Sequence, residues 1–101
     1  MIIQGTTPTH KVTLPFDTGV IKCVRFVYSQ NGEVKVVKST EDITMDGATL
    51  SVRLTQEDTF SLSHTMRVQL IVRVLTITGD ALASEPISMT VRGCCDCEVL
   101  A

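Results

Sequence analysis

Residues 66–77, MRVQLIVRVLTI, are apolar at every second position from Val68 to Val74. In an extended chain successive side chains point to opposite faces, so Val68, Leu70, Val72 and Val74 share one face. Arginine and glutamine side chains occupy the other face together with Ile71. This period of two predicts a long β-strand with one face in a core. Other segments of the chain must therefore pack over that apolar face.

Two hairpins are predicted upstream. Asn31 and Gly32 separate IKCVRFVYSQ from EVKVVKS, and both residues tolerate the positive φ of a two-residue type I′ turn. That loop would place Phe26 opposite Val37 and Val27 opposite Val36. A second hairpin joins DITM to ATLSVRL through Asp46 and Gly47. Further strands are expected at HKVTLPF, where Pro15 indicates an edge or a bulge, and at PISMTVR.

One helical turn is expected near residues 56–60, because Thr55 and Asp58 have the spacing of a capping box. Short strands with frequent turn signals otherwise predict an all-β fold, a two-sheet antiparallel β-sandwich of immunoglobulin-like type. The Cys-Trp-Cys signature of antibody domains is missing, since there is no Trp, and a small virion-type barrel is the alternative. We expect a single domain over residues 1–92, with an N-terminal arm at 1–9, followed by a tail at 93–101.

The core is expected to be aliphatic, because aromatic residues make up only 4 % of the chain. Its predicted members are the inward side chains of the strands: Val12, Leu14, Val24, Phe26, Val37, Leu50, Val52, Leu54, Val68, Leu70, Val72, Val74, Ile87, Met89 and Val91.

Charge and hydropathy argue against several classes of partner. The net charge is −2, and neither half carries the basic stripe that binding to nucleic-acid phosphates requires. The longest apolar run, VQLIVRVL, is interrupted by Arg73 and is too short to cross a membrane. The N-terminus lacks the pattern of a secretory signal, so we expect synthesis and residence in a reducing cytoplasm.

The C-terminal segment RGCCDCEVLA contains Cys94, Cys95 and Cys97. A structural zinc site needs ligands from separated points of the backbone, and no second knuckle accompanies this CCxC. A disulfide needs an oxidising compartment, and the neighbouring Asp96 and Glu98 oppose the thiolate that catalysis requires. We therefore expect a reduced acidic tail and no metal or cofactor.

No other pattern of catalytic residues is found. His10 and His64 are isolated and are expected in or near loops, with solvated or capping roles. The acidic residues of the turns, among them Asp17, Asp42 and Asp58, are expected to cap and to be solvated. The chain is therefore not expected to be an enzyme.

A candidate protein interface follows from the first hairpin and the long strand. Each has apolar side chains on both faces, and only one face can lie on the domain's own core. The remaining faces predict a partner surface containing Val27, Val34, Val36, Ile71 and Leu75. The alternative is that a loop or the terminal arm of the same chain covers these residues.

The segments MIIQGTTPTHKVTLPFDT, LSVRLTQEDT, VQLIVRVLTITGDALAS and the ending EVL resemble a family of small uncharacterised structural proteins of phages and prophages of Gram-positive bacteria. The chain departs from that family at GCCDC, where the family has an acidic stretch. The resemblance implies a non-enzymatic component of the virion, in head, connector, tail or baseplate, made in the bacterial host cytoplasm. Its partners would be other virion proteins and further copies of itself. The alternative function is a module that binds carbohydrate or a host surface, for which exposed aromatic side chains are the expected sign.

Overall fold

The computed structural model describes residues 1–93 and 99–100, and most of these residues lie in strands. The strands are β1 (Ile2–Ile3), β2 (Thr9–Thr13), β3 (Ile21–Gln30), β4 (Glu33–Lys38), β5 (Ile43–Asp46), β6 (Thr49–Arg53), β7 (Val68–Thr76), β8 (Ala81–Ala83), β9 (Ile87–Met89) and β10 (Val91–Arg92). Short helical segments are η1 (Thr18–Val20), η2 (Thr40–Asp42) and α1 (Gln56–Phe60). The predicted all-β class and the helical turn at 56–60 are confirmed.

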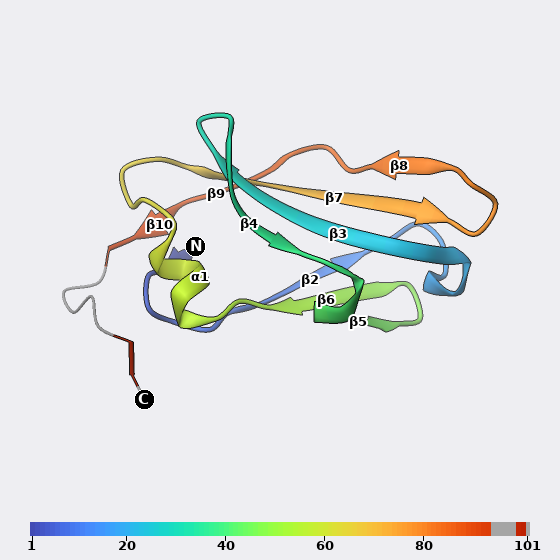
Figure 1. Cartoon of the computed structure of the whole chain (residues 1–101), viewed down its shortest axis with the longest axis horizontal. Helices are drawn as coiled ribbons and strands as arrows, with labels where there is room; N and C mark the ends of the chain where they lie inside the picture. The colour runs from blue at the N-terminus through green and yellow to red at the C-terminus, as the bar shows by residue number, and fades with distance from the viewer. Residues whose placement is uncertain (94–98, 101) are drawn as a thin grey trace.

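The strands form two antiparallel sheets and one small parallel pair. The larger sheet has the order β4-β3-β7-β8, with β9 also paired to β7, and the smaller sheet has the order β2-β6-β5. The parallel pair joins β1 to β10. Figure 1 shows the long strands β3 and β7 side by side, with β2, β6 and β5 lying against them. The fold is therefore sandwich-like.

The core lies between the sheets and is almost entirely aliphatic. Of the predicted members, those that are buried are Val24, Phe26, Leu50, Val52, Leu54, Val68, Leu70, Val72, Val74 and Val91. Val12, Leu14 and Met89 are partly buried against it. Six further residues, which were not predicted as core members, are also buried: Ile2, Ile21, Tyr28, Val36, Ile43 and Leu62.

The prediction for Val36 and Val37 was wrong, because a β-bulge interrupts the first hairpin. The turn itself forms as expected, with φ of 50° at Asn31 and 78° at Gly32. Beyond it the register shifts, so that Val27 pairs with Val37 and Tyr28 with Val36. A shift of one residue moves every later side chain to the other face. Val36 is consequently 6 % exposed in the core, and Val37 is 44 % exposed.

Ile87 is the second predicted core residue that lies outside the core, with 41 % of its surface exposed. It pairs with Leu70 from the short strand β9 at the edge of the larger sheet. The segment 81–92, expected to contain one strand from Pro86 onward, is divided into β8, β9 and β10. An edge strand of three residues offers little cover to its own side chains.

The first nine residues, expected to be an arm, are built into the domain. Ile2 is 1 % exposed, and its strand β1 pairs with β10. The hydroxyl of the buried Thr59 accepts a hydrogen bond from the backbone N–H of Gly5 at 2.9 Å. Gly5 has a φ of 80°, and a Cβ there would lie 2.8 Å from the ring of Phe60. The N-terminal segment is thus fastened both to β10 and to α1.

Helix α1 is held by the predicted capping box and by an ion pair. The Asp58 N–H donates to Thr55 Oγ1, and the Thr55 N–H donates to Asp58 Oδ2. Lys38 Nζ, at the end of β4, lies 2.6 Å from Asp58 Oδ2. These contacts, led by the hydrogen bond from Lys38, hold the pKa of Asp58 below its ordinary value although partial burial opposes the shift. Asp17 and Asp42 likewise accept hydrogen bonds from Gly19 and Ser39 as predicted caps.

Candidate interaction surface

The outer face of the larger sheet carries an apolar surface crossed by two arginines. Across β3 and β7 the directly opposed pairs are Cys23 with Leu75, Arg25 with Arg73, and Val27 with Ile71. Apart from Lys22, their neighbours along each strand point into the core, so these side chains share the face turned away from it. Val37 of β4 extends the surface beside Val27.

Four of the five predicted interface residues lie on this outer face. Val34 is 55 % exposed, and Val27, Ile71 and Leu75 are half-buried by their neighbours on the sheet. Val36 does not belong to the surface, because the bulge turns it inward and Val37 takes its place. The N-terminal segment pairs through β1 with β10. We call the set Val27, Val34, Val37, Ile71 and Leu75 the outer apolar surface.

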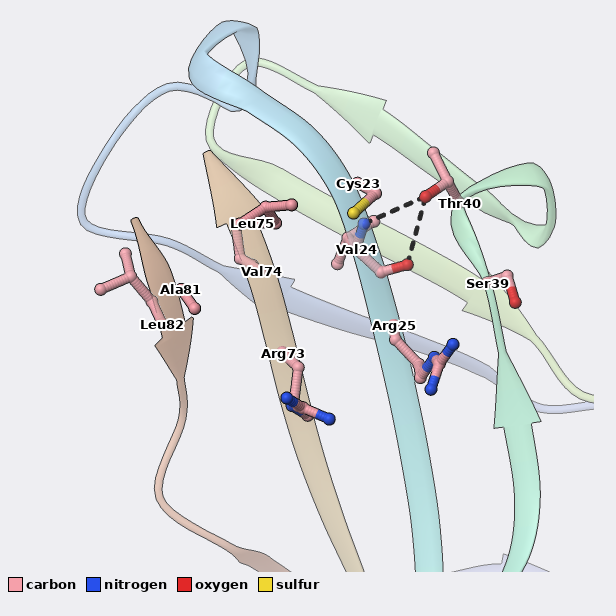
Figure 2. Close-up of a pocket in the computed structure, with 10 residues that line it drawn as sticks. All are labelled: Cys23, Val24, Arg25, Ser39, Thr40, Arg73, Val74, Leu75, Ala81 and Leu82. Atoms are coloured by element: carbon pink, nitrogen blue, oxygen red, sulfur yellow. Dashed lines mark hydrogen bonds between the residues drawn. The ribbon is translucent and has the colours of Figure 1, made fainter. Parts of the chain in front are cut away.

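A shallow hollow of about 410 Å³ lies beside the arginines. It is lined by Cys23, Val24, Arg25, Ser39, Thr40, Arg73, Val74, Leu75, Ala81 and Leu82. Figure 2 shows the guanidinium groups of Arg25 and Arg73 on neighbouring strands and on the same side of the sheet. Thr40 Oγ1 accepts from the Val24 N–H at 3.0 Å and donates to the Val24 carbonyl at 3.3 Å, which fixes one wall of the hollow.

A second groove, of about 340 Å³, lies at the open side of the two sheets. Its lining is mostly apolar. On one side are Val12 of β2 and the following residues Leu14 and Phe16, and on the other are Val72, Val74 and Leu82 of the larger sheet. The outer edges of β2 and β8 are unpaired among the described strands. The half-buried state of Val12, Leu14 and Phe16 follows from this open side.

His10 is part of β2, which corrects the expectation of a loop histidine. It pairs with Val52 and is half-buried, and its Nδ1 lies 2.6 Å from the hydroxyl of Tyr28 on the opposite sheet. Burial raises the pKa of the Tyr28 hydroxyl, so the phenol stays protonated. Burial, followed by the positive charge of the N-terminus, lowers the pKa of His10. The pair is a polar bridge between the sheets, whereas His64 is exposed.

The lowered pKa of His10 predicts a loss of stability in mild acid. The unfolded chain, with an imidazole pKa near 6.5, binds a proton more readily than the folded chain, so the free energy of unfolding falls as the pH drops below about 6.5. We expect a lower urea midpoint at pH 5 than at pH 7.5. The pKa of Asp58 is lowered from 3.8, so Asp58 stays ionised throughout this range.

The matched variants are His10→Gln and His64→Gln. The first removes the titrating group from the bridge and should flatten the pH dependence of the midpoint. The second removes an exposed imidazole and is the control for replacing a histidine by glutamine. A wild-type slope that survives in His10→Gln would contradict the assignment.

The cysteine tail falls largely outside the described residues, since Cys94, Cys95 and Cys97 lie within 94–98. Beyond them, the backbone of Leu100 exchanges two hydrogen bonds with the side-chain amide of Gln56, at 2.8 and 3.0 Å. Cys23 is an exposed free thiol. Within residues 1–93 and 99–100, no three His, Cys, Asp or Glu side chains cluster as ligands for a metal ion.

Comparisons with protein-family models, with curated proteins and with solved structures found no match to this chain. In the part of the chain that the structure covers, no helix is long and apolar enough to cross a membrane. The geometry of the outer face is therefore the basis for assigning a function.

Proposed function

We propose that this chain is a non-enzymatic structural protein of a bacteriophage particle, in the head, connector, tail or baseplate. It would act through contacts with other virion proteins and with further copies of itself. The observation that carries the proposal is the outer apolar surface: Val34 and Val37 are 55 % and 44 % exposed beside Val27, Ile71 and Leu75. Exposed apolar side chains with charged residues among them are typical of a protein–protein contact.

The resemblance of the sequence to small phage and prophage structural proteins supports the same proposal. It covers the N-terminal segment, β6 with α1, and β7 with β8. Location in the virion, after synthesis in the host cytoplasm, is part of the proposal.

We also propose that the sheets have an immunoglobulin-like arrangement. In support, the order β4-β3-β7-β8 faces β2-β6-β5, α1 connects β6 to β7, and β1 pairs in parallel with β10. Sheets of this membership characterise variable-type immunoglobulin domains. One departure is the outer edge of β2, which has no partner among the described strands although such domains have a strand there.

The alternative is a module that binds carbohydrate or a host surface, for which exposed aromatic side chains are expected. Sugar recognition commonly uses exposed aromatic rings. Phe26 and Tyr28 are fully buried here, and Phe16 and Phe60 are half-buried. No observation on the described residues favours this alternative over a protein contact.

The proposal is tested on particles purified from the host that carries the gene. Mass spectrometry should find the chain in the particle in a fixed ratio to other virion proteins. A Val34→Glu, Val37→Glu variant should keep its fold, because both side chains are exposed, yet be lost from the particle. An unpaired carboxylate buried in an apolar contact costs several kcal/mol, so we expect incorporation to fall about 100-fold or more.

Thr44→Glu is the matched control, because Thr44 is exposed on β5 of the smaller sheet. It should enter the particle as the wild type does. Light scattering should show a wild-type mass above that of the monomer, reduced in the double variant. Absence of the wild-type chain from purified particles would refute the proposed function.

A further inference from the structure

The outer apolar surface is crossed by two positive charges in direct opposition. Arg25 on β3 and Arg73 on β7 are paired residues of the antiparallel ladder, and both are exposed. Directly opposed side chains of such a ladder have Cβ atoms about 5 Å apart, and like charges at this spacing destabilise the sheet. The isolated domain therefore bears a local electrostatic cost at the centre of this surface.

Nothing in the described part of the chain offsets that cost. The ion pairs there join Lys35 to Glu33 and Lys38 to Asp58, and neither guanidinium of Arg25 or Arg73 has a hydrogen bond or ion pair. Other arginines differ: Arg53 donates to Thr7 Oγ1 at 3.2 Å, and Arg67 donates to Ser88 Oγ at 2.7 Å. The guanidinium donors of Arg25 and Arg73 thus have no acidic side chain as an acceptor among residues 1–93 and 99–100.

The surroundings of the pair suit a carboxylate that arrives with an apolar surface. The pairs on either side along the strands, Val27 with Ile71 and Cys23 with Leu75, would exclude water once a partner docks. A guanidinium binds a carboxylate through two parallel N–H donors, and such pairs strengthen as water is removed. The adjacent hollow of about 410 Å³ leaves room for the incoming side chain.

The charges around this surface favour a protein carboxylate over nucleic acid as the ligand of the two arginines. Binding to nucleic acid depends on several neutralised phosphates, whereas the neighbouring lysines of β4 are already paired with acids. The net charge of −2 opposes a polyanion as well.

We propose that Arg25 and Arg73 together bind one Glu or Asp carboxylate of a partner protein, at the centre of the contact made by the outer apolar surface. The inference rests on the proposed function, because it names the chemistry of the partner at that same surface. The two arginines select for an acidic residue, and the valines and Ile71 supply the apolar contact around it.

The first experiment supplies the carboxylate within the chain. Arg73→Glu places an acid opposite Arg25 and should raise the urea midpoint above that of the wild type, with Arg73→Gln between the two. The gain should shrink in 1 M salt, where the Debye length is about 3 Å. Arg53→Glu, which introduces the same charge elsewhere, should give no gain. Equal urea midpoints for the wild type and Arg73→Glu would overturn the claim that Arg25 and Arg73 repel each other without an acid to offset the repulsion.

The second experiment uses acetate as the probe. In ¹⁵N-labelled protein, the Nε–H signals of Arg25 and Arg73 should shift and saturate with sodium acetate, whereas those of Arg53 and Arg67 should not. Sodium chloride at equal ionic strength should produce no saturation. Equal shifts at all four arginines would overturn the site, and so would saturation by inorganic phosphate at tenfold lower concentration than by acetate. Binding of a DNA duplex at this face would likewise overturn it.

The third experiment separates this inference from the proposed function. A variant with Arg25→Gln and Arg73→Gln should enter particles at least tenfold less than the wild type, and Arg25→Lys with Arg73→Lys should recover part of the loss. Arg53→Gln with Arg67→Gln is the control and should enter normally. If Val34→Glu, Val37→Glu is excluded while the Arg-to-Gln variant enters normally, the carboxylate site is refuted and the proposed function stands. If the wild type is absent from particles, the proposed function fails, and acetate binding still tests the arginine pair.

Discussion

Phe26→Ala is expected to lower the free energy of unfolding by about 3–5 kcal/mol. Phe26 is completely buried in β3, opposite Val72 of β7. Removing its ring leaves a cavity between the two sheets. The strands are hydrogen-bonded to one another, so no single strand can move inward to fill that cavity. A domain of this size has roughly 5–15 kcal/mol of stability in total, so the variant should lose a large share of it. Urea denaturation at pH 7.5 measures the change, and the thermal midpoint should fall by more than about 12 °C.

Phe16→Ala is the matched control, because it removes the same ring from a half-buried position at the open groove. We expect it to cost roughly 1–2 kcal/mol, in proportion to the smaller apolar area removed from water. Similar losses for the two variants would mean that the groove between β2 and β8 is as well packed as the centre of the sheets.

Regular strands were the most predictable part of this fold. Their alternation depends only on which face of each strand is apolar, and that information is local. Val68, Leu70, Val72 and Val74 are buried as predicted, and the Asn31-Gly32 turn and the Thr55-Asp58 cap form as predicted. Each of these features is set by residues within a few positions of one another.

Features that depend on distant partners could not be predicted. The bulge in the first hairpin exchanges the roles of Val36 and Val37, and nothing in EVKVVKS marks the residue that is left unpaired. Ile2 is buried because β10 is available to pair with β1, 89 positions later in the register of Ile2 with Val91. His10 bonds to Tyr28 because the two sheets face each other.

In the candidate site, too, some features are set by the local sequence and others by distant partners. The period of two predicted that Val27, Ile71 and Leu75 point away from the core, and they do so. The opposition of Arg25 and Arg73 depends on the register between β3 and β7, which are separated by more than 35 residues of sequence. No local pattern sets that register, so the two arginines become a pair only in the folded sheet.

Gln30→Leu is expected to destabilise the domain by roughly 2–4 kcal/mol, because it removes three hydrogen bonds of about 1 kcal/mol each and leaves their partners poorly satisfied. Gln30 is 1 % exposed at the end of β3. Its Nε2 donates to the carbonyls of Ser63 and Met66 at 2.7 and 3.1 Å, and its Oε1 accepts from the Ser63 N–H at 2.8 Å. One side chain therefore holds the segment between α1 and β7.

The substitution should destabilise the segment between α1 and β7 more than it destabilises the rest of the domain. Hydrogen exchange at the Ser63 amide should accelerate in Gln30→Leu by a larger factor than exchange at the amides of β7, because the loop loses its only side-chain acceptor for that N–H among the described residues. Gln69→Leu is the matched control, since Gln69 is exposed on β7, and its free energy of unfolding should stay within about 0.5 kcal/mol of the wild type. If the Ser63 amide remained as protected in Gln30→Leu as in Gln69→Leu, the loop would be held by its own backbone and the glutamine would be dispensable.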